Sequence, residues 1–98
     1  MKGMTFKVSE DARSRYRGLL VEYKSIMEKT FQSADPDWEA IGFVAHKLKG
    51  SAAMYGYPEL TEMADRLGYG AKLGVRDDVL KAMTEVCTRI DVILDQTG

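Results

Sequence analysis

Apolar residues recur at intervals of three and four along most of the chain, which is the period of an α-helix with one buried face. The first such segment covers about residues 9–31. Ser9 is suited to cap its N-terminus, and Glu10 and Asp11 favour the positive end of the helix dipole. We expect its core-facing stripe to consist of Ala12, Tyr16, Leu19, Leu20, Tyr23, Ile26, Met27 and Phe31.

Three further segments follow the same period. The second covers about residues 36–55, with Asp35 as its cap, Pro36 at its first helical position and Gly56 as its stop. The third covers 58–73, and Gly68, Gly70 and Gly74 weaken its second half. Its apolar face carries Leu60, Met63, Ala64, Leu67 and Ala71. The fourth covers 76–95, with Val79, Leu80, Met83, Val86, Cys87, Ile90, Ile93 and Leu94 expected to face inward.

This pattern predicts an all-α fold. Neither an Asn-Gly nor an Asp-Gly hairpin turn occurs, and no segment alternates cleanly between apolar and polar residues. Segments of similar length with short connections favour an antiparallel up-down four-helix bundle, formed by one domain over residues 1–98. The alternative is a pair of helical hairpins that completes its core by dimerising. A closed core of four helices favours a monomer, which is the state we expect.

Composition narrows the function classes. The 98 residues are 45% apolar, as in globular proteins, and they allow one modest core without a deep active site. With 14 basic and 15 acidic residues, the chain lacks the basic surplus of a nucleic-acid-binding protein, so we expect no nucleic-acid partner. The single cysteine, Cys87, excludes an intrachain disulfide. Its helical spacing from Met83 and Ile90 indicates a small core residue rather than a reactive thiol.

The ends and the apolar runs bear on where the protein resides. The first residues lack the apolar region of a signal peptide, and no run approaches the roughly 18 apolar residues of a membrane span. We therefore expect a soluble, cytoplasmic protein that does not bind membranes. The start at Met1 favours a free-standing protein over a domain of a larger kinase.

The second segment differs from the others on its outer face. At about 100° of rotation per residue, its core arc holds Trp38, Ile41, Ala45, Leu48, Ala52 and Tyr55. His46, the one histidine of the chain, falls off this arc, towards solvent. Gly42 lies one turn before His46, Gly50 one turn after it, and Ala53 two turns after it. Lys49 lies beside the histidine, and Phe43 is also on the outer side.

Two glycines on an exposed helical face require a reason, because glycine inside a helix costs about 1 kcal/mol relative to alanine. Small residues around His46 would let another protein approach the imidazole closely, and Phe43 would anchor that partner. An exposed imidazole is a nitrogen nucleophile, and Lys49 could stabilise a phosphoryl group bound to it. A partner would then supply the acidic groups and the metal.

Other chemistries of a lone histidine are less consistent with this sequence. Zinc requires three or four ligands, and the chain has no second histidine and no suitable cysteine, so we expect no metal site. Ser51 lies on the opposite flank of the helix, and no nucleophile elbow is present, which disfavours a Ser-His-Asp triad.

Residues 45–56, Ala-His-Lys-Leu-Lys-Gly-Ser-Ala-Ala-Met-Tyr-Gly, resemble the signature of the histidine-phosphotransfer (HPt) domain family of two-component phosphorelays. The resemblance covers about residues 38–80. It implies a four-helix bundle in which His46 takes a phosphoryl group from a receiver-domain aspartate and passes it to another receiver. It also implies that Lys49 supports the phosphate, that Gly50 leaves room for the receiver, and that Gly56 allows the turn into the third helix.

The resemblance further implies that the chain has no kinase activity and no cofactor of its own, because the receiver domain of a response regulator or hybrid kinase supplies magnesium. One departure concerns the third helix. Similar proteins often carry a polar side chain near the histidine where this chain has Gly68, so Lys72, one turn later, is our candidate helper. The alternative is that Lys72 is an ordinary solvated lysine of the surface. Two other functions stay open, namely a binding module without phosphotransfer and an enzyme acting on another substrate.

Overall fold

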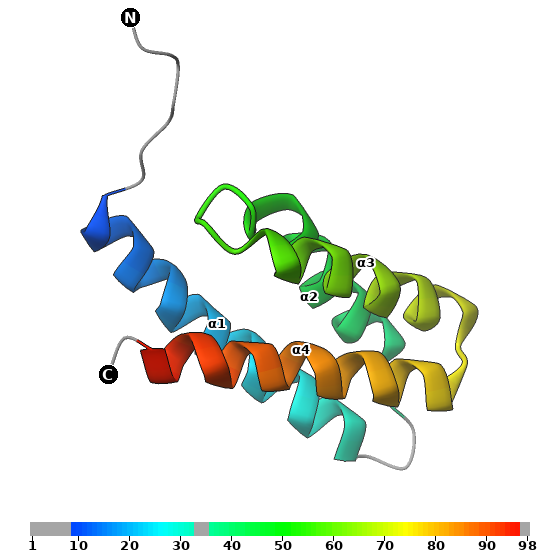
Figure 1. Ribbon diagram of the computed structural model, residues 1–98. Helices are drawn as coiled ribbons and strands as arrows, with labels where there is room; N and C mark the ends of the chain where they lie inside the picture. The colour runs from blue at the N-terminus through cyan, green and yellow to red at the C-terminus, as the bar shows by residue number, and fades with distance from the viewer. Residues whose placement is uncertain (1–8, 33–35, 97–98) are drawn as a thin grey trace, which may run out of the picture.

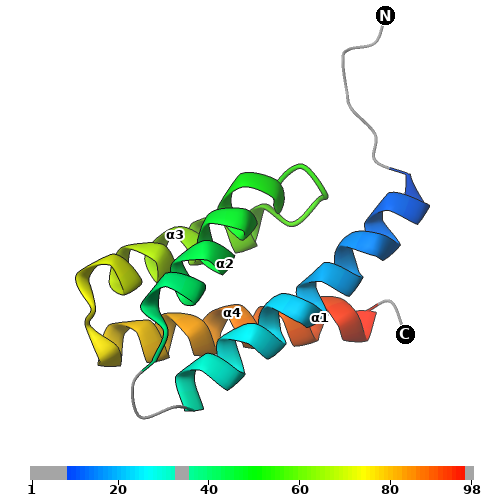
Figure 2. The same ribbon diagram turned by 180° about the vertical axis from the view of Figure 1, so that it is seen from behind.

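The computed structural model describes residues 9–32 and 36–96, which form four helices joined by short connections (Figures 1 and 2). Helix α1 spans Glu10–Gln32, α2 Trp38–Ser51, α3 Pro58–Leu73 and α4 Arg76–Gln96. The described residues contain no strand. The chain runs up and down along successive helices, which confirms the predicted all-α four-helix bundle.

The helices α2 and α3 form an antiparallel hairpin that provides one side of the bundle. Helix α4 packs along α3, and α1 closes the bundle by contacting both α2 and α4 (Figure 2). The α2–α3 turn lies near the N-terminal half of α1. Every helix therefore has two neighbours, and each leaves a wide outer face to solvent.

The core is a single cluster of apolar side chains drawn from all four helices, and no charged or polar residue is buried in the described part of the chain. Its largest fully buried members are Leu20, Met27, Ile41, Leu48, Leu60, Leu67 and Ile90. Burial of such side chains is the main stabilising contribution in a bundle of this size. The period of three and four predicted these positions correctly.

Three residues expected to face inward are exposed instead. The exposed fraction is 41% for Leu19, 36% for Ile26 and 45% for Leu80. Leu19 and Ile26 lie on the flank of the α1 stripe, about 60–80° of rotation from Tyr16 at the helical period. Because α1 has only two neighbours, the arc that the bundle covers is narrower than the apolar stripe, and these side chains stay outside it.

Cys87 lies at the edge of the core, where it packs against the buried cluster. Burial raises the pKa of its thiol to about 11, and nearby Glu28 acts in the same direction. A thiol with so high a pKa is almost entirely protonated near neutral pH and is a poor nucleophile. This environment agrees with the expected role of Cys87 as a small core residue.

The N-terminus of α2 differs from the prediction. Asp37, not Asp35, caps the helix, because its Oδ1 accepts a hydrogen bond of 3.1 Å from the backbone N–H of Ala40. Pro36 therefore precedes the cap and is not the first helical residue. Asp35 lies outside the described residues. An aspartate cap satisfies an amide that has no partner within the helix.

The other end of α2 is one turn shorter than the predicted limit of residue 55. After Ser51 the backbone tightens, and the N–H of Tyr55 bonds to the carbonyl of Ala52 at 3.1 Å. The chain then turns towards α3 at Gly56, with a φ of 94° and a bond of 2.9 Å from Tyr57 N–H to Ala52 O. Gly56 thus makes the expected turn into α3, but it is not the stop of α2, whose C-cap is Ala52. Gly74, with a φ of 69°, is the left-handed C-cap of α3.

Candidate functional site

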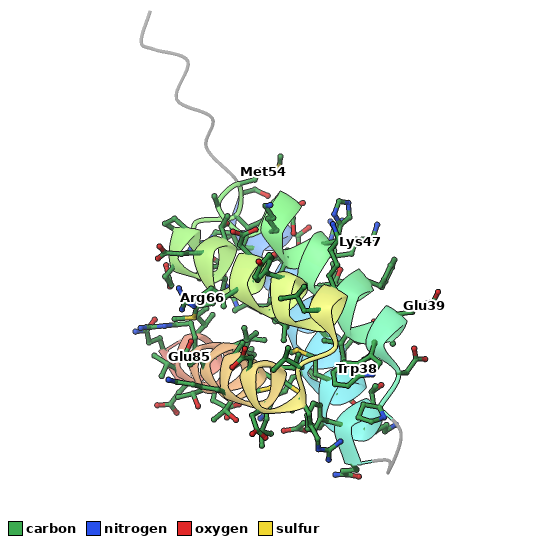
Figure 3. All side chains as sticks on the ribbon, turned by 90° about the vertical axis from the view of Figure 1, so that its right-hand side faces the viewer. Trp38, Glu39, Lys47, Met54, Arg66 and Glu85 are labelled. Atoms are coloured by element: carbon green, nitrogen blue, oxygen red, sulfur yellow. The ribbon has the colours of Figure 1, made fainter. Side chains whose placement is uncertain are left out.

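His46 lies in the middle of α2, with its side chain exposed to solvent. Ala45 and Leu48 on the same helix are buried, so the imidazole points away from the core as the helical wheel predicts. Figure 3 shows Glu39 and Lys47 projecting from the outer side of α2, while Trp38 lies against α1 through an edge-on contact with Phe31. The backbone beneath the histidine is therefore held by the core.

A shallow depression of about 420 Å³ lies between α2 and α3 at this histidine. Helix α2 contributes Gly42, Ala45, His46 and Lys49 to its lining, and α3 contributes Ala64, Asp65, Gly68, Tyr69 and Lys72. Of the residues predicted for the site, Gly42, His46, Lys49 and Lys72 thus share one surface hollow. Such a hollow is accessible to another protein but does not enclose a substrate.

Phe43, Gly50 and Ala53 do not line this depression, but all three are exposed on or just beyond α2. Phe43 is 54% exposed, and the Lys47 ammonium lies over its ring at 5.4 Å from the centroid. Ala53 lies in the turn after α2 rather than in the helix. Outside the depression, α2 and the turn after it thus expose Phe43, Gly50 and Ala53 to solvent.

The glycines of the site have different surroundings. A Cβ atom added to Gly42 or Gly50 would meet nothing within 4 Å. A Cβ atom on Gly68 would lie 3.4 Å from the Cβ of Ala45. Gly68 thus faces Ala45 of α2 at contact distance, whereas Gly42 and Gly50 have open space beside them.

Lys49 does not point freely into solvent. Its ammonium lies 2.8 Å from Oδ1 of Asp65 on α3, in an ion pair whose side chains are 56% and 63% exposed. Sequence reasoning missed both Asp65 and Tyr69, a ring that is 66% exposed at the rim of the depression. Their positions along α3 could have indicated them, because Asp65, Tyr69 and Lys72 follow one another at intervals of four and three residues. Residues at these intervals share one face of a helix.

The end of α2 is fixed from behind by a buried tyrosine of α1. The hydroxyl of Tyr16 lies 2.8 Å from Oγ of Ser51. The Ser51 hydroxyl in turn donates a 2.7 Å hydrogen bond to the backbone carbonyl of Lys47. The ring of Tyr16 stacks on Tyr55 at 4.3 Å between centroids. Burial raises the pKa of Tyr16, so this hydroxyl stays protonated. These contacts hold the last turn of the histidine-bearing helix in place.

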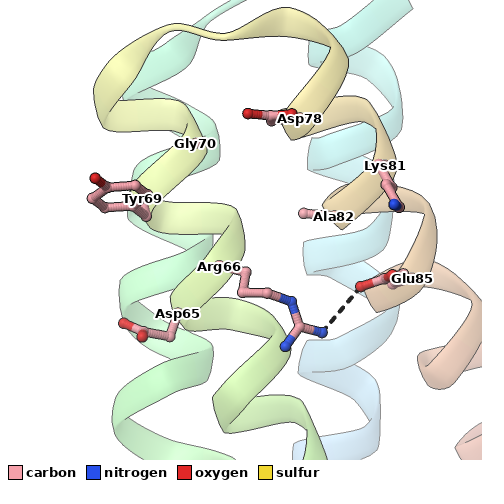
Figure 4. A pocket seen from close by; sticks show the side chains of 8 residues that line it. All are labelled: Asp65, Arg66, Tyr69, Gly70, Asp78, Lys81, Ala82 and Glu85. Atoms are coloured by element: carbon pink, nitrogen blue, oxygen red, sulfur yellow. Dashed lines mark hydrogen bonds and ion pairs between the residues drawn. The ribbon is translucent and has the colours of Figure 1, made fainter.

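A second hollow, of about 480 Å³, lies between α3 and α4 (Figure 4). Arg66 extends there towards Glu85, while Asp65 and Tyr69 point to the other side of α3. Arg66 and Glu85 form an ion pair of 3.1 Å. This hollow contains none of the predicted site residues.

No three or more His, Cys, Asp or Glu side chains among the described residues are grouped so that they could hold a metal ion. None of the described helices has the length and apolarity that crossing a membrane requires.

The family model described as "Hpt domain" matches residues 10–96, which is nearly the whole chain. No curated protein and no solved structure matches it.

Proposed function

Because the chain belongs to the Hpt domain family, which has a phosphotransfer role in two-component signalling, we propose that it is a phosphorelay intermediate whose phosphoryl acceptor is His46. The donor is the phosphorylated aspartate of a receiver domain, and the acceptor is the aspartate of another. The observation that supports this most is the exposed His46 between Gly42 and Gly50, two glycines whose outer sides are open.

The proposed transfer is a direct exchange between the two proteins. The lone pair of the unprotonated ring nitrogen of His46 forms the N–P bond as the P–O bond to the receiver aspartate breaks. The electron pair of that P–O bond returns to the aspartate carboxylate. The reverse exchange with a second receiver restores the imidazole. Neutral imidazole is nucleophilic without a neighbouring base, so an exposed histidine is sufficient on this side.

The chain's own residues would support this exchange in three ways. Lys49 would contact the phosphoryl oxygens through a charge-assisted hydrogen bond. Gly42 and Gly50 would admit the receiver backbone, and Phe43 and Ala53 would contact its surface. Lys72, at the α3 side of the depression, would add positive charge. Magnesium would be held by the acidic residues of the receiver, and this chain would need no cofactor.

Family members are phosphocarriers rather than catalysts. We propose that this chain likewise has no kinase activity, acts as a monomer in the cytoplasm, and meets receiver domains of response regulators or hybrid kinases rather than nucleic acid or membranes. Incubation with ATP and magnesium alone should leave it unlabelled.

The direct test uses a phosphorylated receiver domain with labelled phosphate. We expect acid-labile, base-stable label on the wild-type chain and none on His46→Gln. Thr88→Gln is the control, because Thr88 is an exposed residue of α4 away from the depression. Circular dichroism should show both variants folded.

Failure to label the wild-type chain with several receivers would contradict the carrier function and would favour a binding module. Label that persists in His46→Gln would show that another residue is the acceptor.

A further inference from the structure

The ion pair between Lys49 and Asp65 has a consequence for the phosphorylated state, given the proposed function. Among the described residues that line the depression, Asp65 is the one acidic side chain, and it contacts the lysine that the proposed function assigns to the phosphate. A lysine has one ammonium group with three donors on a flexible stem, so it can exchange one anion for another.

Stability of the bundle does not explain this pair. Both side chains are more than half exposed, and exposed ion pairs contribute little because water and salt screen them. The α2–α3 contact is already made by buried apolar residues and by the close approach of Gly68 to Ala45. Asp65 therefore matters chiefly through its charge in the depression.

A phosphoryl group on His46 would bring a charge of about −1.5 to −2 into the depression, by analogy with other phosphorylated side chains. Asp65 would then act in two ways. Its carboxylate competes with the phosphoryl oxygens for Lys49, and it repels them directly, since like charges in one site disfavour each other. Both effects raise the free energy of the phosphorylated chain.

We propose that Asp65 is a positioning residue that keeps Lys49 in an ion pair while His46 is unmodified and lowers the retention of phosphate on His46 once it is modified. The group thereby passes on to the next receiver more readily. No new bond-making step is involved. Asp65 alters only the equilibrium and lifetime of the phosphohistidine.

The experiment compares Asp65→Asn with the wild-type chain in two measurements. One is the ratio of phosphohistidine to receiver phosphoaspartate at equilibrium, and the other is the half-life of phosphohistidine after the receiver is removed. Exposed charge pairs are worth up to about 1 kcal/mol, so we expect the ratio to shift about two- to fivefold towards His46. The half-life should lengthen, and Asp65→Glu should restore the wild-type values.

The chain offers a matched control. Glu85→Gln removes the other described ion pair of α3, that between Arg66 and Glu85, on the opposite side of the helix. It should change neither measurement. A second check is ionic strength, because added salt should narrow the difference between Asp65→Asn and wild type, which a purely structural effect would not show.

The outcomes are distinguishable. If the wild-type chain carries no label, the proposed function fails and this inference falls with it. If wild type is labelled normally but Asp65→Asn behaves like Glu85→Gln, the inference on Asp65 is overturned while the phosphocarrier function stands. A shift away from His46 would also overturn it, because it would mean that Asp65 orients Lys49 towards the phosphate.

Discussion

At the scale of single residues, the glycines around His46 differ in whether packing within the chain accounts for their small size. Gly68 lies against Ala45, so its size matters to the packing of α3 on α2. Gly42 and Gly50 have no atom within 4 Å of an added Cβ, so nothing within the described chain requires them to be glycine. Because glycine weakens a helix, their presence favours a reason outside the chain, and the proposed function supplies one in the close approach of a receiver.

The open space beside Gly50 leads to a prediction for substitutions there. Gly50→Glu should leave the bundle folded, because the side chain would extend into open space. It should slow phosphoryl transfer from a receiver, by steric conflict and by the added negative charge beside His46. Gly50→Ala should raise the free energy of unfolding by about 0.5–1 kcal/mol and also slow transfer, though less. Stopped-flow or rapid-quench transfer rates and urea unfolding measure the two effects.

Gly18 is the matched control. It lies in the interior of α1, is exposed, and likewise has nothing within 4 Å of an added Cβ. Gly18→Ala should stabilise the bundle by a similar amount and leave transfer unchanged. Transfer rates for Gly50→Glu equal to wild type would show that receivers do not dock over Gly50.

Around His46, the sequence predicts which residues of one helix lie together, but not which residues of a second helix lie beside them. The outward direction of His46 and the positions of Gly42 and Lys49 beside it follow from the rotation per residue of one helix, and they were predicted. Asp65 and Tyr69 were missed because they belong to another helix. Their distance from His46 depends on how far α3 is shifted along α2, and the packing of buried side chains between the two helices sets that register.

At the scale of elements, the bounds of α3 were predicted to the residue, whereas α2 ends one turn before its predicted limit at residue 55. Pro58 begins α3, and Gly74 ends it with a positive φ, as their chemistry indicates. The cap of α2 was misplaced because Asp35 and Asp37 are both suitable caps, and the pattern does not distinguish them. The exposed Leu19, Ile26 and Leu80 were misassigned because an apolar stripe does not reveal how wide a face its neighbours cover.

The turn at Gly56 gives a prediction for stability. Its φ of 94° is strained for any residue with a Cβ atom, and an added Cβ would lie 3.5 Å from the Arg13 guanidinium. Gly56→Ala should therefore lower the free energy of unfolding by about 1–2 kcal/mol, since left-handed backbone costs about that much for an L-residue. Urea unfolding followed by circular dichroism measures it. A Gly56→Ala variant as stable as Gly18→Ala would contradict the left-handed backbone at Gly56.

At the scale of the whole molecule, the core and the site are separated. The core is apolar and lies between the helices, whereas His46, Lys49 and Asp65 lie on the outer surface of the α2–α3 hairpin. The Tyr16–Ser51 contact joins the two, because it ties the last turn of α2 to α1. Surface changes at the site should therefore alter transfer while the bundle stays folded.

Ionisation of groups at the edge of the core should lower the free energy of unfolding at alkaline pH. The thiol of Cys87 has its pKa raised from 9.0 to about 11 in the folded chain, chiefly by burial. The unfolded chain therefore loses this proton first as the pH rises, so the folded state binds more protons between about pH 9 and pH 11. Under linkage, the free energy of unfolding falls through this window. The raised pKa values of Tyr16 and Tyr23, both due first to burial, extend the loss to higher pH.

Comparison of wild type with Cys87→Ala isolates the part of this fall in the free energy of unfolding that is due to the thiol. Urea unfolding under reducing conditions should find wild type the more stable chain near pH 8, because the side chain packs on the core. Ionisation of the thiol then favours the unfolded wild-type chain alone, so the difference between the two proteins should shrink as the pH approaches 11. The tyrosines and the Lys24–Asp91 ion pair are common to both chains and cancel in that difference. A difference that stays constant across this window would mean that Cys87 is as accessible to water in the folded bundle as in the unfolded chain.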